Sequence, residues 1–168
     1  MARLLFYSVN GTGLGHVTRV LAVARQVRRL APDSEILVFT SSENSGVLWR
    51  EDIASVKVPS FEAMKADQRL PLMQINHAIT AQTVATFRPH IAIVDSQTAG
   101  VFSELLAPLL TIPKRIFLFG RFPNYFSQRP YRTALQYYER ILMPYNEDEK
   151  DGIGINMDER AQWVGDIL

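Results

Sequence analysis

The chain of 168 residues contains no cysteine, which excludes disulfides, thiolate nucleophiles and zinc sites built on cysteine. It has no apolar stretch near the roughly 20 residues of a transmembrane helix, and the apolar run over residues 4–9 is too short for the core of a signal peptide. The net charge is only +1, so no bulk field attracts nucleic acid. These absences predict a cytoplasmic protein that touches a membrane at most peripherally.

The composition that remains is that of one globular domain. Hydrophobic residues make up 47% of the chain and charged residues 21%, which is ordinary for a protein with a buried core, and 168 residues suit a single domain. The chain ends on an apolar segment, "QWVGDIL", although termini are usually polar and loosely held. This end predicts either a last strand of the sheet or a segment that continues or packs on a partner.

Strand-like and helix-like segments alternate along the chain. Strands are predicted over residues 3–9, 34–40, 53–59, 90–96 and 114–120, with a short sixth over 140–144, and helices over 16–30, 71–87, 98–106 and 131–140. In the first helix the apolar residues recur at helical spacing and Arg19, Arg25 and Arg28 lie outside the apolar stripe. Strands joined by helices pair in parallel. We therefore predict an α/β fold with a doubly wound, mostly parallel, Rossmann-like sheet in the order 3-2-1-4-5-6.

A glycine-rich loop, "NGTGLGH", joins the first strand to the first helix. No lysine follows the glycines, which excludes a Walker phosphate loop, and His16 stands where a dinucleotide fingerprint needs a small residue, so NAD and FAD are disfavoured. Gly11, Gly13 and Gly15 permit positive φ and close backbone approach beside Thr12. At a helix N-terminus such a loop can hold a phosphate or a carboxylate; the alternative is a turn that merely requires glycine.

His16 and Asp95 are the candidate catalytic residues. His16 lies in the first turn of the first helix, where the helix dipole disfavours imidazolium, and a neutral imidazole can act as a general base. Asp95 ends the fourth strand, which neighbours the first at the switch point of a doubly wound sheet. The two side chains should therefore meet in one crevice, with Asp95 holding the ring tautomer. Alternatively, Asp95 only caps the helix that follows.

The remaining polar candidates are weaker. Two further residues join the glycine loop as substrate-binding candidates: Ser96, beside Asp95, and Arg121, after the fifth strand. For Arg121 the alternative is an ordinary surface arginine. His77 is expected on a helix surface and His90 in a turn. No run of acidic residues has a metal-ligand spacing, so no metal site is predicted.

Several segments resemble the N-terminal domain of GT-B glycosyltransferases, especially the bacterial MurG-like and related enzymes. "VNGTGLGHVTRVLAVARQVR" is similar to their first strand, Gly-His loop and first helix. "RPHIAIVDSQTAGVFSELLAPLLTIPKRIFLF" looks like their fourth strand, helix and fifth strand, and "RILMP" and "QWVGDIL" resemble the end of that domain. The resemblance spans nearly the whole chain.

The resemblance implies an acceptor-binding domain of an inverting, metal-independent glycosyltransferase. A nucleotide-sugar donor would be the co-substrate, with no cofactor, and a second domain would hold it. A sugar, lipid-linked or other small molecule would be the acceptor. His16 would be the base and Asp95 its partner. Since this chain supplies one domain only, the donor domain would lie in the same protein or in a separate chain. A non-catalytic binding subunit and half of a nucleotide-sugar epimerase are the alternatives.

Overall fold

The computed structural model describes residues 1–9, 13–61, 65–120, 133–146 and 159–167. Its strands are β1 (Arg3–Ser8), β2 (Glu35–Thr40), β3 (Ala54–Lys57), β4 (Ile91–Asp95), β5 (Lys114–Leu118), β6 (Arg140–Met143) and β7 (Ala161–Trp163). Its helices are α1 (Gly15–Leu30), α2 (Gly46–Trp49), the 3₁₀ helix η1 (Ala66–Gln68), α3 (Arg69–Phe87) and α4 (Leu106–Leu109).

The seven strands form one sheet in the order β3-β2-β1-β4-β5-β6-β7, and every neighbouring pair is parallel. This confirms the predicted fold class and strand order. The apolar end of the chain supplies β7, which pairs with β6 through Met143 and Trp163. The strand order reverses between β1 and β4. Because these two strands are parallel neighbours, their carboxyl ends lie side by side, with Tyr7 opposite Val94.

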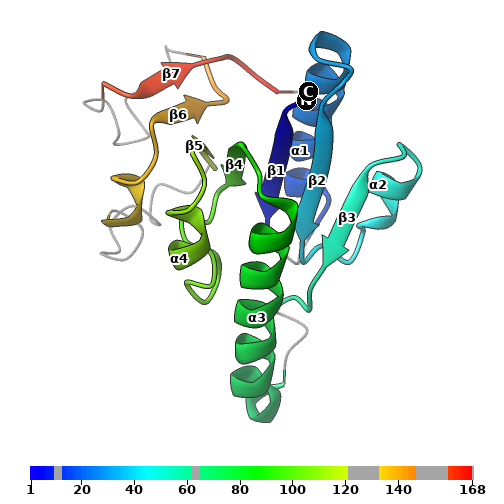
Figure 1. Cartoon of the computed structure of the whole chain (residues 1–168), viewed down its shortest axis with the longest axis vertical. Coiled ribbons are helices and arrows are strands. Elements are labelled where there is room, and N and C mark those ends of the chain that lie inside the picture. Colours follow the sequence, from blue (N-terminus) through cyan, green and yellow to red (C-terminus); the bar gives the residue numbers. More distant parts are fainter. Residues whose placement is uncertain (10–12, 62–64, 121–132, 147–158, 168) are drawn as a thin grey trace.

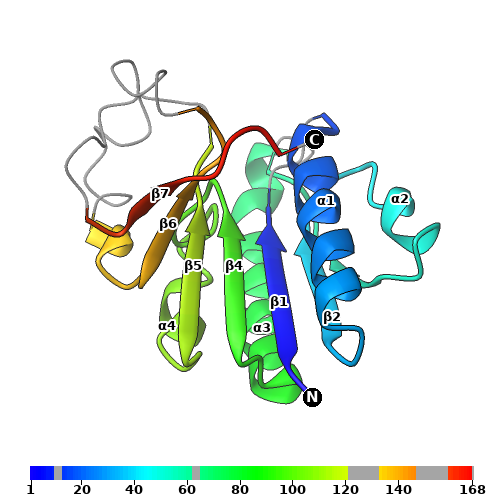
Figure 2. The same ribbon diagram turned by 90° about the horizontal axis from the view of Figure 1, so that it is seen from above.

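Two helical layers cover the sheet, with α1 on one face and α3 on the other (Figures 1 and 2). Successive residues of β1 point to opposite faces, as the pleat of a strand requires. Leu4 and Phe6 therefore pack in a core cluster with Val17 and Val20 of α1, whereas the other cluster contains Leu5, Tyr7 and Val84.

The predicted helix over residues 98–106 is wrong, since residues 97–105 form turns and α4 begins only at Leu106. Gly100 and Ser103 adopt positive φ angles of 85° and 62°, which a helix does not allow. The Glu104 carboxylate accepts hydrogen bonds from the backbone N–H groups of Val101 and Phe102, at 3.2 and 2.7 Å. This side chain thus takes donors that a helix would have used.

The predicted helix over residues 131–140 is also too long. Within its described part, residues 133–140, helical structure ends by residue 135 and β6 begins at Arg140. The buried Tyr138 donates a hydrogen bond to the carbonyl of Thr98, at 2.6 Å. The N–H of Glu139 already bonds to the carbonyl of Arg115 at the start of β5. Pairing with the sheet therefore replaces the last turns of the helix.

Candidate active site

Three of the candidate residues, His16, Asp95 and Ser96, meet at the carboxyl edge of the sheet. Strands β1, β4 and β5 all end at this edge, and the first turn of α1 rises beside them (Figure 2). The last described residues cross the same edge from β7 toward α1, where Ile167 packs against the core cluster on the α1 face. The fold thus brings five separate segments of the chain together at one place.

His16 and Asp95 form a direct hydrogen bond, with 2.7 Å between the ring Nδ1 and the carboxylate Oδ2. A carboxylate can only accept, so Nδ1 carries the proton in this contact. In a neutral ring the other nitrogen, Nε2, is then the basic one. The His16 side chain is 14% exposed, whereas that of Asp95 is fully buried. The pair therefore has the geometry of a general base held by a buried carboxylate.

The Asp95 carboxylate also binds a residue that the sequence pattern placed with the solvent-facing arginines. The Arg19 Nη2 atom lies 3.0 Å from Oδ1, and the Arg19 side chain is only 16% exposed. Ser96 Oγ donates to Oδ1 at 3.2 Å and Ser8 Oγ approaches Oδ2 at 3.4 Å. Arg19 follows His16 by three residues, so both lie on one helix face. That spacing was the signal in the sequence that could have identified Arg19.

Ser96, a predicted substrate-binding residue, lies beside His16 and Asp95, and a strained backbone holds it there. Its φ is 63°, which is uncommon for a residue with a side chain. Its N–H bonds to the carbonyl of Leu118, and its Oγ lies 3.3 Å from His16 Nδ1. A Cβ placed on Gly120 would overlap Ser96 Oγ and come 2.9 Å from Ser96 Cβ. Glycine at position 120 therefore makes room for Ser96 beside the histidine.

Part of the predicted glycine loop is described. Gly13 adopts a φ of 81°, which suits glycine alone, and Gly15 begins α1. The other predicted substrate-binding residues, Gly11, Thr12 and Arg121, lie outside the described residues. Among the described side chains none caps the N-terminus of α1, and its first turn has no acidic residue. The backbone N–H groups of this turn thus receive no side-chain acceptor in the described part of the chain.

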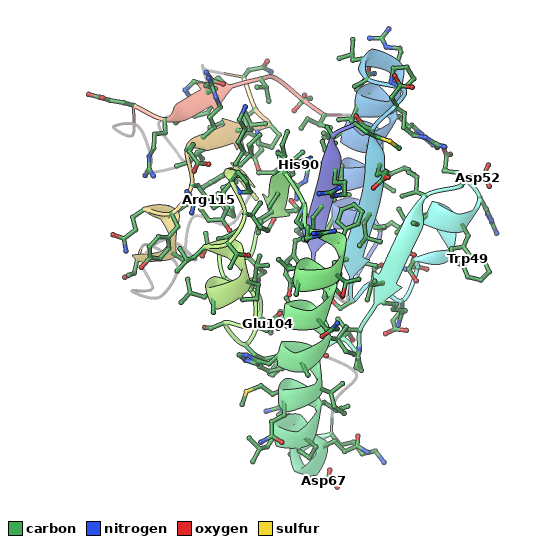
Figure 3. All side chains as sticks on the ribbon, in the orientation of Figure 1. Trp49, Asp52, Asp67, His90, Glu104 and Arg115 are labelled. Carbon is green, nitrogen blue, oxygen red and sulfur yellow. The ribbon has the colours of Figure 1, made fainter. Side chains whose placement is uncertain are left out.

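A buried polar cluster supports the segment that follows Ser96. Glu104 lies in the loop between β4 and α4, beside α3 (Figure 3). It accepts a hydrogen bond from the hydroxyl of Tyr7 on β1, at 2.7 Å. Burial raises the pKa of Tyr7 well above its ordinary value, and the negative charge of Glu104 raises it further. The neutral hydroxyl therefore remains a donor that anchors this loop to the strand before the site.

The other histidines lie apart from this constellation. His77, on α3, contacts the carbonyl of Phe102 at 3.0 Å, and His90 accepts from the backbone N–H of Arg3 before β4 begins. No group of three or more His, Asp or Glu side chains in the described ranges is arranged to hold a metal ion. Among the described helices, none is both long and apolar enough to span a membrane.

An open groove of about 840 Å³ lies on the other side of the molecule, between α3 and strands β1 to β3. Its lining includes Leu37, Val56, Ile79 and Phe87, and it reaches the first residues of β1 and β2. It therefore opens toward the amino edge of the sheet and contains none of the candidate residues. The candidate site is assigned to the carboxyl edge, where His16 and the buried Asp95 carboxylate are in direct contact.

Solved structures of similar fold include both glycosyltransferases and an epimerase. No family model and no curated protein matches the sequence. The Anabaena protein HepE, in complex with UDP-glucose, matches with a TM-score of 0.66 and 14% identity over 99% of this chain and 44% of its own. Acinetobacter baumannii MurG matches with a TM-score of 0.60 and 12% identity over 86% of this chain and 42% of its own. The chain has the GT-B domain fold.

This GT-B domain also matches a UDP-N-acetylglucosamine 2-epimerase, with a TM-score of 0.59 and 15% identity over 98% of this chain and 48% of that one. The chain thus spans less than half the length of each of these three structures. The resemblance predicted from the sequence is confirmed at the level of the fold.

Proposed function

We propose that this GT-B domain is the acceptor-binding part of an inverting, metal-independent glycosyltransferase that uses a nucleotide-sugar donor. The observation that carries the proposal is the 2.7 Å contact between His16 Nδ1 and the buried Asp95 carboxylate. A base that removes the proton of an acceptor hydroxyl needs a free ring nitrogen and an orienting partner. The pair at the carboxyl edge supplies both.

In the proposed reaction His16 Nε2 takes the proton of the acceptor hydroxyl. The acceptor oxygen bonds to the anomeric carbon of the donor sugar from the face opposite the leaving group. The bond between that carbon and the phosphate oxygen breaks, and its electron pair leaves with the nucleoside diphosphate. Asp95 holds the ring and stabilises the imidazolium that forms. Attack from the opposite face inverts the anomeric configuration, and no metal is needed in these steps.

The glycine loop and its neighbours are assigned to substrate binding. The backbone of Gly13 and Gly15, with Gly11 and Thr12, would line the cleft and hold phosphate charge at the N-terminus of α1. Ser96 and Arg121 would contact the acceptor, which is a sugar, a lipid-linked molecule or another small molecule. The donor would be held mainly by a second domain, in the same protein or in a partner chain.

The test is sugar transfer by the protein isolated from its own cells, together with any chain that co-purifies. UDP-glucose and UDP-N-acetylglucosamine are supplied as donors with a set of acceptors, and the products are analysed. We expect a glycosylated acceptor of inverted configuration, and a loss of about 10²-fold or more in rate for His16→Ala. His77→Ala is the matched control and should retain the rate. A rate unchanged in His16→Ala would refute the assignment of the base.

A second candidate is half of a nucleotide-sugar epimerase, which the match to the UDP-N-acetylglucosamine 2-epimerase favours. The same assay separates the two functions. An epimerase converts UDP-N-acetylglucosamine to its epimer when no acceptor is present, whereas the proposed transferase requires the acceptor. Epimer formation without acceptor would replace the transferase proposal.

A further inference from the structure

The groove beside α3 leaves part of a parallel sheet without a cover. Parallel sheets are normally buried on both faces, and α3 lies behind β1 and β4 (Figure 2). Over β2 and β3 the same face is open, since Leu37 and Val56 line the groove and are only half-buried. On the opposite face, Val38 of β2 is fully buried in the cluster beneath α1. Helices are the elements that cover a sheet in α/β folds, so the open half-face fits a further helix.

The outward side of α3 is unusual for a helix that faces water. From Leu70 to Phe87 the helix has no Asp, Glu, Lys or Arg, whereas α1 exposes Arg25, Arg28 and Arg29. Charged residues are depleted at the centre of protein interfaces. The composition of α3 is therefore that of a helix which is covered on its outer side as well as on the side that packs on the sheet.

The residues of this outer side recur with the spacing of a packing seam. Ile75, Ala78, Gln82 and Ala85 are all exposed and follow one another at intervals of three or four residues, which places them on one helix face. Ile75 alone leaves 46% of its surface exposed. Two parallel helices pack together through residues at this spacing. The outer side of α3 thus suits contact with a second helix that runs parallel to it.

One symmetry operation covers both the open half-face and the outer side of α3. A two-fold axis parallel to the strands carries α3 of each copy over β2 and β3 of the other. An axis across the strands would instead bring the two α3 helices onto each other. With the axis along the strands, the two helices run parallel and side by side, and the contact uses the same surface on both copies. The chain therefore supplies both halves of the contact.

The charges at the rim of the groove agree with this axis. Arg88 follows α3 and Glu35 begins β2, and both line the groove at the amino edge of the sheet. Both are exposed, and neither side chain forms an ion pair with another residue of the described ranges. Because the two amino edges lie together in such a dimer, Arg88 of each copy faces Glu35 of the other. The symmetry makes this pair twice.

We propose that the groove is the interface between two copies of this chain, with α3 of each copy packed over β2 and β3 of the other. The face with Ala78 and Gln82 in one copy then covers Leu37 and Val56 of the other. Because the axis runs along the strands, the two carboxyl edges face the same way and stay outside the contact. The proposal goes beyond the proposed function and does not depend on it.

The test is sedimentation equilibrium of the full chain over a range of concentrations, for which we expect a reversible dimer. Ala78→Lys adds a charge at an exposed position that lines the groove, so the single chain can accept it. In the dimer it brings two unpaired charges into the contact, and the dissociation constant should rise by about 10²-fold or more. Gln26→Lys, at an exposed position of α1, is the matched control and should leave the constant unchanged.

A charge exchange tests the choice of occupant. Arg88→Glu and Glu35→Arg should each raise the dissociation constant by about tenfold, because each places like charges together. The double variant should return it close to the wild-type value, since the pairs form again with their signs exchanged. If a charge variant unfolds, Ala78→Lys decides alone.

Three results would overturn the proposal: a chain that is monomeric at every concentration, a dimer that Ala78→Lys does not weaken, or a different protein found bound at the groove. Losses that add up in the folded double variant would also contradict the pairing. Because these measurements need no substrate, their outcome is independent of the proposed sugar transfer.

Discussion

Replacing Gly120 by alanine is expected to disrupt the site from a position that carries no functional group. The new Cβ would overlap Ser96 Oγ, which can rotate away, but it would also come 2.9 Å from Ser96 Cβ. This Cβ moves only with the backbone. That backbone is tied to Leu118 and already has a φ of 63°. The substitution must therefore displace either β5 or the residue that follows Asp95.

The expected cost follows from overpacking. Extra methyl groups in a well-packed region typically destabilise by about 1–3 kcal/mol, and in a domain of this size each 1 kcal/mol lowers the melting temperature by about 2–4 °C. We expect Gly120→Ala to lower the melting temperature by roughly 2–12 °C. Since Ser96 Oγ lies 3.3 Å from His16 Nδ1, the NMR signals of the His16 ring should also shift.

Gly46→Ala provides the matched control. Gly46 begins α2, has no neighbour within 4 Å of a Cβ, and has no positive φ. Alanine there should be neutral or slightly stabilising, because it favours the helix more than glycine does. Calorimetry on both variants and the wild type tests the reasoning. Equal melting temperatures for Gly120→Ala and Gly46→Ala, with unchanged His16 signals, would show that Ser96 does not depend on this glycine.

Three further predictions concern buried and paired side chains. Tyr7→Phe removes the hydroxyl that binds the buried Glu104. Chemical denaturation should show that the free energy of unfolding falls by about 1–3 kcal/mol. A fall of less than about 0.5 kcal/mol, the effect of a neutral surface change, would contradict the anchoring role. Burial raises the pKa of Tyr138 well above the ordinary 10.0, so its contribution to stability is present below about pH 10 and is lost as the pH rises further; unfolding titrations should show a shallower alkaline decline for Tyr138→Phe, and an equally steep decline would contradict this. Burial pushes the pKa of Glu139 upward, but hydrogen bonds from Arg115 leave it below the ordinary 4.5. The contribution of this pair to stability is present above that pH and is lost as the pH falls through the lowered pKa. Arg115→Met should therefore flatten the acid side of the curve of stability against pH, and an unaltered acid side would rule out the pair as its source.

The sheet and the main site contact were predictable because they depend on topology. A parallel sheet with its strand order reversed between β1 and β4 places the ends of these strands together. His16 and Asp95 follow directly from that rule, because one lies just after β1 and the other at the end of β4. Apolar runs were sufficient to identify β1 to β6, since buried parallel strands are apolar throughout. For the segment that forms β7 the sequence left a strand and a continuing or partner-bound segment open.

Arg19 and the loop before α4 were not predictable in the same way. Helical periodicity assigns an arginine outside the apolar stripe to solvent. The first turn of α1, however, lies at the edge where β4 and β5 end, so a polar side chain there meets Asp95 and the carbonyl of Phe119. The segment after Ser96 has helix-compatible residues, but the Glu104 carboxylate binds its backbone instead. Both outcomes depend on contacts between distant segments, which local patterns do not contain.

The most direct test of the central claim is the rate of sugar transfer in His16→Ala, Asp95→Asn and the double variant. If Asp95 acts through His16, the single losses should each be large, and the double variant should lose no more than His16→Ala alone, because residues that act as a unit are not additive. A loss of about 10²–10⁴-fold is the expected size for a general base. Losses that multiply in the double variant, or a His16→Ala rate equal to that of the wild type, would contradict the account.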